Sequence, residues 1–337
     1  MNTLRKSVHV LLCCMLFVPF VLAACGDAEE DLTAVRVGEV TRSIFYAPQY
    51  IAIEKGFFEE EGLDVELTTT WGGDKTMTTL LSGGIDVALV GSETSIYVYL
   101  QGSDDPVVNF AQLTQTDGTF LVSRHEAEDF TWEQLRGSSF LGQRKGGMPQ
   151  MAGEFTLKQH GIDPHRDLEL IQNIDFANIA SAFASGTGDY VQLFEPQATV
   201  FEMEGIGHVL ASFGEESGRL PYTVFMSKQS FIQENPEIVQ KFTNAVYRAQ
   251  LWLEEADPAE AAGLIAPYFE DTELAVIQTV IERYQNQQSY ALDPAIDEEE
   301  WERLQDIMEE AGELPKRVDH AILVDNQFAN NAAEHVK

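Results

Sequence analysis

The sequence predicts an α/β protein of two lobes, joined by two hinge crossings. Three observations lead to this prediction. From residue 35 onward, short β-branched runs alternate with helical stretches, the pattern of a sheet with crossover helices. The chain has 337 residues, 44% of them hydrophobic, which is too long for one ordinary core. Extended segments near residues 121 and 220 are placed to carry the chain between the lobes.

The first residues indicate a targeting segment. Arg5 and Lys6 precede an apolar run, and the run ends in Leu22-Ala23-Ala24-Cys25-Gly26, which resembles the lipobox of bacterial lipoproteins. We therefore expect residues 1–24 to be a lipoprotein signal peptide and Cys25 to carry lipid. A transmembrane anchor is the alternative, but the run is short for a span of about 20 residues. Residues 25–34 are predicted to form a polar tether.

Composition limits the partners of the folded part. The only cysteines are Cys13, Cys14 and Cys25, so disulfides and cysteine metal sites are excluded from the mature domain. The net charge of −34 repels nucleic acid and anionic lipid. We expect a monomer on the outer face of the cytoplasmic membrane, held there by its lipid alone and without nucleic acid.

Lobe I is predicted to comprise residues 35–120 and 221–337. Its first strand is expected at 35–40, followed by a helix that begins near Pro48 and ends at the Lys55-Gly56 cap. Alternating residues predict a strand at 63–69. The remaining elements are a helix ending at 82–84, a strand at 85–90, a helix to about Gln101 and, after the second crossing, a strand at 220–226 and a mostly helical segment from Pro236.

Lobe II is predicted at residues 121–220. Strands are expected at 120–123, 138–142, 169–171 and 190–194, with a helix that begins at Pro149.

In the helical C-terminal segment of lobe I, Ile238, Phe242, Val246 and Ala249 are spaced as the packed face of a helix. In open sheets of this kind, ligands bind beyond the carboxyl ends of the strands, which here are residues 41–46, 70–73 and 91–94.

The stretch 44–65, IFYAPQYIAIEKGFFEEEGLDV, resembles the start of importer solute-binding proteins of the nitrate, sulfonate, taurine and thiamine-precursor class. Residues 80–90, LLSGGIDVALV, and the Glu195-Pro196 pair resemble later parts of that class. The resemblance implies a type II periplasmic-binding-protein fold with mixed sheets and helices. It also implies a ligand held between the lobes and delivery to an ABC permease with its ATPase.

The candidate ligand residues come from these strand ends and from the crossings. Phe45, Tyr46 and Trp71 could sandwich a flat ring, and Trp71 adjoins two glycines that let backbone approach closely. Glu195 could receive an amino group, with Glu93 and Asp117 as weaker candidates. The full predicted set is Phe45, Tyr46, Trp71, Ser92, Glu93, Thr94, Thr116, Asp117, Gly146, Met148, Glu195 and Tyr222.

Two ligand classes remain open. The aromatic residues and Glu195 favour an amine-bearing heterocycle, such as a pyrimidine precursor of thiamine, and this is the class we expect. Arg42, Arg144 and Lys145 instead favour an alkanesulfonate or carboxylate.

We expect no enzyme activity, cofactor or metal. The fold also resembles fungal thiamine-pyrimidine synthases, but their cysteine-rich motif is absent and the seven histidines are scattered. A sensing protein that presents its closed form to a receptor is a further alternative, because it would use the same closure.

Overall fold

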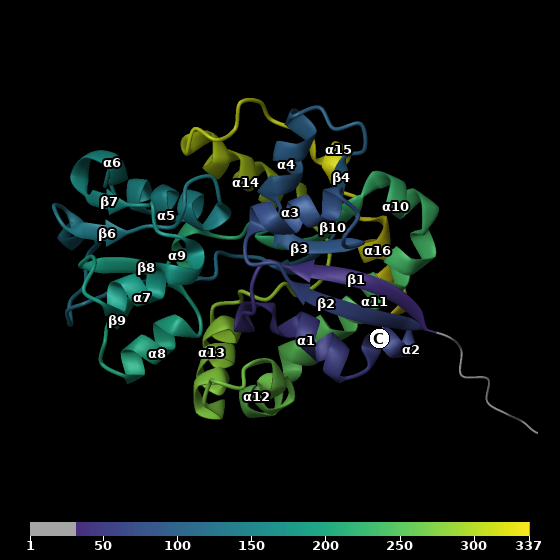
Figure 1. Ribbon diagram of the computed structural model, residues 1–337, viewed down its shortest axis with the longest axis horizontal. Coiled ribbons are helices and arrows are strands. Elements are labelled where there is room, and N and C mark those ends of the chain that lie inside the picture. Colours follow the sequence, from purple (N-terminus) through teal and green to yellow (C-terminus); the bar gives the residue numbers. More distant parts are fainter. Residues whose placement is uncertain (1–31, 337) are drawn as a thin grey trace, which may run out of the picture. The chain divides into compact units, whose positions relative to one another are not determined.

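Two five-stranded sheets organise the computed structural model, which describes residues 32–336 (Figure 1). The predicted signal peptide, the lipidation site Cys25 and most of the predicted tether lie outside these residues. The first sheet has the order β2-β1-β3-β10-β4, with β1 Thr33–Glu39, β2 Leu63–Thr69, β3 Val87–Gly91, β4 Val107–Thr114 and β10 Thr223–Lys228. The second has the order β7-β6-β8-β5-β9, with β5 Thr119–Ser123, β6 Ser139–Leu141, β7 Glu169–Ile171, β8 Tyr190–Phe194 and β9 His208–Ser212.

Both sheets are mixed. In the first, β1 runs parallel to β2 and β3, and the returning strand β10 runs antiparallel to β3 and β4. In the second, β6 runs parallel to β7 and β8, and β5 runs antiparallel to β8 and β9. The predicted α/β class with mixed sheets and helices is therefore confirmed.

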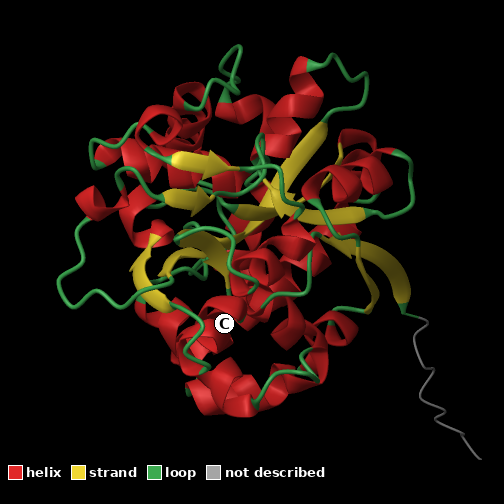
Figure 2. Cartoon of the chain, turned by 60° about the vertical axis from the view of Figure 1, so that its left-hand side comes forward, coloured by secondary structure: helices red, strands yellow, loops and turns green. Residues whose placement is uncertain are grey.

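Helices pack around the strands (Figure 2). The helices before the first crossing are η1 Ile44–Tyr46, α1 Ala47–Glu54, α2 Phe57–Glu60, α3 Gly73–Leu81 and α4 Glu93–Leu100. Between the crossings lie η2 Trp132–Leu135, α5 Met148–Gln159, α6 Pro164–Asp167, η3 Phe176–Asn178, α7 Ile179–Ala184, α8 Gln197–Met203 and α9 Phe213–Ser217. The C-terminal helices are α10 Gln229–Glu234, α11 Pro236–Glu255, α12 Pro258–Ile265, η4 Ala266–Tyr268, α13 Leu274–Asn286, α14 Glu298–Glu310, α15 His320–Leu323 and α16 Gln327–His335.

Four of the C-terminal helices, α10, α11, α15 and α16, pack on strands of the first sheet. The buried face of α11 includes Phe242, Val246 and Ala249 as expected, whereas Ile238 is only partly buried and its neighbour Val239 packs inward. Among the residues that the structure describes, no helix is long and apolar enough to cross a membrane.

Two chain crossings connect the sheets and lie side by side. The first runs from the end of β4 to the start of β5, and the second runs from α9 to β10. Leu220 N–H donates to Gln115 O at 3.0 Å, and Tyr222 N–H donates to Thr114 O at 3.2 Å, which joins the two crossings. The lobe limits at residues 121 and 220 stay a prediction, because the described residues form one compact unit by their contacts.

Two strands were not expected from the sequence. All eight residues of β4 are buried, and its polar side chains Asn109 and Gln112 bond to other parts of the chain. A strand covered on both faces lacks the alternation of apolar and polar residues by which a half-buried strand is recognised in a sequence. The strand β9 has only five residues and begins at His208, so it offers little pattern.

Candidate functional site

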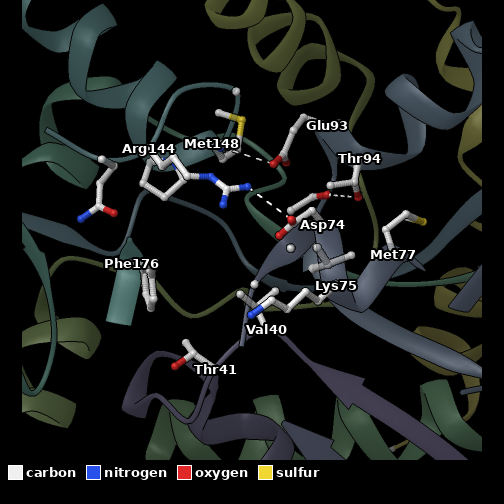
Figure 3. A pocket seen from close by; sticks show the side chains of 18 of the residues that line it. Val40, Thr41, Asp74, Lys75, Met77, Glu93, Thr94, Arg144, Met148 and Phe176 are labelled. Atoms are coloured by element: carbon white, nitrogen blue, oxygen red, sulfur yellow. Dashed lines mark hydrogen bonds and ion pairs between the residues drawn. The ribbon is translucent and has the colours of Figure 1, made fainter. Parts of the chain in front are cut away.

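A cavity of about 730 Å³ lies where the carboxyl ends of β1, β2 and β3 approach the second sheet (Figure 3). This volume is typical of a site for a small organic molecule. From the first-sheet side, the lining includes Thr41 and Ser43 after β1, residues 71–73 after β2, and Gly91, Glu93 and Thr94 after β3. The second-sheet side contributes residues 143–149, residues 175–178 and Phe194.

The structure brings eight of the twelve predicted ligand residues to this cavity and leaves four elsewhere. The residues at the cavity are Phe45, Tyr46, Trp71, Glu93, Thr94, Gly146, Met148 and Tyr222. Those that do not line it are Ser92, Thr116, Asp117 and Glu195. All four residues outside the cavity lie next to residues that line it or within the crossings, so the sequence predicts the region of the site better than the direction of each side chain.

Glu195 differs most from its expected position. Its carboxylate accepts hydrogen bonds from the Thr199 amide at 2.9 Å and the Thr199 hydroxyl at 2.8 Å. The Arg283 guanidinium pairs with it at 2.7 Å. Burial raises the pKa of Glu195, and the Arg283 charge opposes that rise. With these bonds satisfied away from the cavity, Glu195 joins α8 to α13 rather than presenting a free carboxylate to a ligand.

The side chains of the other three residues form hydrogen bonds near the crossings. The Ser92 hydroxyl donates to Pro221 O, and the Thr116 and Ser289 hydroxyls lie 2.8 Å apart. The Asp117 carboxylate accepts the Thr119 amide at 2.6 Å. Burial raises the pKa of Asp117 to about 6. These contacts secure the crossings and leave the side chains outside the cavity.

Glu93 is a buried acid in the cavity wall. It lies in the first turn of α4, immediately after β3, and is 5% exposed. Its Oε1 accepts the Met148 amide at 3.3 Å, so the first turn of α4 contacts the N-terminus of α5 from the second-sheet side (Figure 3). Its Oε2 has no hydrogen-bond partner. Burial raises the pKa of Glu93 to about 7, although the Met148 bond opposes this rise.

Aromatic rings form one wall. The Phe45 ring lies 5.6 Å from Tyr222 in an edge arrangement and 6.1 Å from Phe194, which comes from the second sheet. Phe176 continues the row at 5.7 Å from Phe194. Gly118 leaves room for the Phe45 ring, because a Cβ there would lie 2.9 Å from its carbons. Such rings provide flat apolar contact for a planar ligand.

Trp71 stands at the mouth of the cavity in an unusual conformation. Its side chain is 57% exposed, and its backbone φ of 61° lies in the left-handed region that favours glycine. A bulky residue held there costs roughly 1–3 kcal/mol, a strain that is common at ligand-binding positions. The backbone therefore holds a large ring at the cavity entrance.

The three basic residues of the anion hypothesis are paired. Arg144 lies 3.3 Å from Asp74 across the cavity (Figure 3), and Lys145 lies 3.6 Å from Glu313. Arg42 does not line the cavity and pairs with the buried Glu39 at 3.1 Å. The Arg144 and Lys145 pairs are exposed, and such pairs contribute little to stability, but each of the three cations already has an acidic neighbour.

Several lining residues were not expected from the sequence. They include Asp74, Met77, Tyr97, Gln143, Phe176 and Phe194. The Tyr97 hydroxyl donates to Gly146 O at 3.2 Å, which adds a second contact between α4 and the loop before α5. Phe194 ends the correctly predicted strand β8, so the strand-end rule could have found it. Met77 and Tyr97 lie within helices, where nothing in the sequence distinguishes them from packing residues.

The described residues contain no group of three or more His, Cys, Asp or Glu side chains that could hold a metal ion. The lining of the cavity combines a buried carboxyl, aromatic rings, hydrogen-bonding loops and the charged side chains of Asp74, Lys75, Arg144 and Lys145.

Comparison with known proteins gives a consistent family result. A model of the NMT1-like family matches residues 28–266. The Bacillus subtilis (strain 168) protein YtlA, whose name describes a binding protein, is 63% identical over 314 residues, covering 93% of this chain and 94% of its own. The formylaminopyrimidine-binding protein of Halalkalibacterium halodurans is 25% identical over 241 residues, covering 69% of each chain.

Solved structures share the fold. The alkanesulfonate-binding protein SsuA from Xanthomonas axonopodis pv. citri, bound to MOPS, aligns with a TM-score of 0.69 and 19% identity. The alignment covers 88% of this chain and 99% of that one. At this identity the likeness supports the fold, and it agrees with the type II periplasmic-binding-protein architecture expected from the sequence.

Proposed function

This chain belongs to the NMT1-like family, and on that premise we propose that it captures a small organic molecule for an ABC importer. The relatives and the structural neighbour described above are all named as binding proteins. The chain is accordingly a solute-binding protein of this importer class. Its function would be to hold its ligand in the cavity described above and to deliver it to the permease, which the ATPase powers.

The ligand that we propose is an amine-bearing heterocycle, such as a pyrimidine precursor of thiamine. The observation that carries this choice is the pairing of an aromatic wall around Phe45 with the buried carboxyl of Glu93 in one cavity. A planar ring would pack on the aromatic faces, and its N–H groups would meet an acceptor. The formylaminopyrimidine-binding relative supports a ligand of this kind.

An alkanesulfonate or taurine-type anion is the second candidate. Arg144, Lys145 and Lys75 line the cavity, and a structural neighbour is an alkanesulfonate-binding protein. However, Arg144 and Lys145 each have an acidic partner, and the cavity wall contains the buried acid Glu93. An anion would have to displace those partners and tolerate the carboxyl, so we rank this candidate second.

Closure would bring the two halves together around the ligand. The contacts that span the cavity in the structure would hold the closed form, namely Glu93 with Met148, Tyr97 with Gly146, and Asp74 with Arg144. The adjacent crossings would act as the hinge between residues 121–220 and the remainder. A ligand then gains affinity from contacts that exist in the closed form alone.

We further propose that the protein acts as a monomer outside the cytoplasmic membrane, anchored by lipid on Cys25. The relatives that are periplasmic binding proteins support an extracytoplasmic place. A sensing role that uses the same closure is the alternative, and neighbouring genes for a permease and an ATPase would favour transport.

Calorimetric titration with aminopyrimidines and with alkanesulfonates tests the proposal. We expect one site per chain for an aminopyrimidine and weaker or no binding of alkanesulfonates. Binding of sulfonates alone would overturn the ligand class. Failure of both groups to bind would contradict the use of this cavity for a small organic solute.

A further inference from the structure

Four buried acids lie at or near the cavity and the crossings, and they differ in their charge partners. Glu39 pairs with Arg42 and Glu195 pairs with Arg283, whereas Glu93 and Asp117 have no cation within ion-pair distance among the described residues. Asp117 does not line the cavity, and Glu93 does. Glu93 is therefore a buried acid that meets the ligand space without a cation of the protein to balance it.

The chain makes room for this carboxyl. A Cβ on Gly91 would lie 2.1 Å from Glu93 Oε2 and 2.7 Å from Oε1, so any side chain at position 91 would displace the carboxyl. Gly91 ends β3 and itself lines the cavity. The carboxyl is thus folded back over the strand end, with the Met148 amide on one oxygen and no hydrogen-bond donor on the other.

No basic side chain of the described residues lies within ion-pair distance of Glu93, although Lys75 lines the same cavity. Three buried or half-buried phenols, Tyr46, Tyr97 and Tyr222, feel its charge, and burial is the main cause that raises the pKa of each of them. They stay neutral at physiological pH. The loop before α5 carries Arg144 and Lys145, which pair with Asp74 and Glu313 instead.

We propose that Glu93 determines the specificity of the cavity by accepting an N–H donor of a cationic or amine-bearing ligand and by excluding anions. This inference rests on the proposed function, because it names the residue that selects the ligand in the same cavity. A buried carboxylate without a partner is costly, and a ligand ammonium or amino group would supply the missing donor. An anion would instead add repulsion in a site of low polarity.

Proton balance follows from this assignment. In the empty cavity below neutral pH, the Glu93 carboxyl holds its proton, because the pKa of about 7 is set by burial. When an ammonium group binds, the carboxyl gives up its proton to solvent and pairs with the ligand as a carboxylate. One proton is released for each cation bound, and no bond in the ligand breaks.

The test uses three probes, aminomethylpyrimidine, the corresponding methylpyrimidine without the amine, and ethanesulfonate. Their affinities and proton exchange are measured calorimetrically at pH 6, in two buffers of different ionisation enthalpy. Wild-type protein should bind aminomethylpyrimidine with release of close to one proton. Glu93→Gln should weaken this binding roughly tenfold or more, the loss typical of a charge-assisted hydrogen bond, and should abolish the proton release.

The matched control is Glu300→Gln. Glu300 is also a buried acid, but its carboxylate pairs with Arg219 at 2.6 Å and does not line this cavity. Its variant should keep the wild-type affinity and proton release. Glutamine keeps the size of Glu93 and can still accept the Met148 amide. Thermal unfolding of each variant checks the fold. If Glu93→Gln does not fold, comparing the two pyrimidines on the wild type keeps the test decisive.

The outcomes separate this inference from the function on which it rests. If aminomethylpyrimidine binds wild type and Glu93→Gln equally, or binds wild type no more tightly than methylpyrimidine does, the role of Glu93 is refuted and the proposed function stands. If ethanesulfonate binds wild type more tightly than either pyrimidine, the ligand class and the role of Glu93 both fail. If no probe binds, the proposed function is contradicted, and with it the inference that rests on it. Loss of binding and of proton release in Glu93→Gln alone supports the inference.

Discussion

The Glu93 carboxylate accepts the Met148 amide at 3.3 Å and so joins the first turn of α4 to the N-terminus of α5. These helices follow strands of different sheets, β3 and β6. A helix N-terminus favours a neighbouring negative charge, which makes Met148 a suitable partner for an ionised carboxyl. The contact links ligand recognition by Glu93 to the approach of the two halves, and the predictions below follow from it.

Gly91→Ala should weaken ligand binding through Glu93. The new Cβ would lie 2.1 Å from Glu93 Oε2, so the carboxyl must leave its position over the end of β3. We expect an affinity loss comparable to that of Glu93→Gln, measured by calorimetry with aminomethylpyrimidine. Gly263→Ala in α12 is the control, because nothing lies within 4 Å of its Cβ. That variant should keep its affinity and gain up to about 1 kcal/mol of stability. Equal binding by both variants would contradict the prediction.

The stability of the protein should depend on pH through Glu93. Its pKa is raised from 4.5 to about 7 in the folded state by burial. Between these values the folded state holds a proton that the unfolded state has lost, so the free energy of unfolding falls as pH rises and levels off above about 7. The full decrease is on the order of 3 kcal/mol, at about 1.4 kcal/mol per pKa unit.

Denaturant unfolding of wild type and Glu93→Gln at pH 5 and pH 8 measures this dependence. Asp117, whose pKa burial raises to about 6, adds a slope of the same sign in both proteins. The difference between the two proteins isolates Glu93, and the variant should lose less stability on going to pH 8. If the free energy of unfolding changes equally in both proteins between pH 5 and pH 8, ionisation of Glu93 does not destabilise the folded state and the prediction is wrong.

Glu195→Ala should destabilise the fold rather than remove a ligand contact. The carboxylate is buried and bonded to Thr199 and Arg283, and its loss leaves the half-buried Arg283 with only Glu202, at 3.0 Å. Breaking a buried pair on one side typically costs about 3–5 kcal/mol, and the remaining partner should reduce this to about 2–3 kcal/mol. Thermal and denaturant unfolding measure the loss. An unchanged stability together with lost ligand affinity would restore Glu195 to the ligand site.

Trp71→Ala should weaken binding without unfolding the protein. The ring is exposed at the cavity mouth, so its removal opens no core cavity. We expect an affinity loss of roughly tenfold, as for removal of one aromatic stacking contact of about 1–2 kcal/mol. The unfolding midpoint should hardly change. Wild-type affinity in this variant would remove Trp71 from the site.

Arg144→Gln separates the two ligand classes. The pair of Arg144 with Asp74 is exposed on both sides, and such pairs contribute about 0–1 kcal/mol. For an amine-bearing ligand, the variant should change affinity by less than about threefold. For a sulfonate ligand, loss of the guanidinium should cost about tenfold or more. Titration of the variant with aminomethylpyrimidine and ethanesulfonate distinguishes these results.

The sequence predicted the positions of strand ends better than the directions of side chains. Strands β2, β7 and β8 have the predicted bounds, because alternation and turn residues mark them. The three strand ends expected to hold ligand all contribute to the cavity. The sequence does not reveal which distant residue each polar side chain bonds to in the folded protein.

The two glutamates illustrate this limit. Glu195 follows an apolar strand and looked available for a ligand, but Arg283 lies 88 residues further along the chain and pairs with it. From the sequence, Glu93 is only a weaker candidate than Glu195 for receiving an amino group. Its burial and its contact with Met148 depend on how the two sheets approach each other. No local pattern encodes that approach.

The most direct test of the central claim is a competition experiment read by native mass spectrometry. The protein is incubated with an equimolar mixture of aminomethylpyrimidine, methylpyrimidine, taurine and ethanesulfonate, and the bound molecule is then released from the isolated complex, so that its own mass and charge identify the ligand class. The account predicts one adduct per chain with the mass of aminomethylpyrimidine, strongly reduced in Glu93→Gln. An adduct with ethanesulfonate or taurine, or an unmodified chain mass with every probe present, would contradict it.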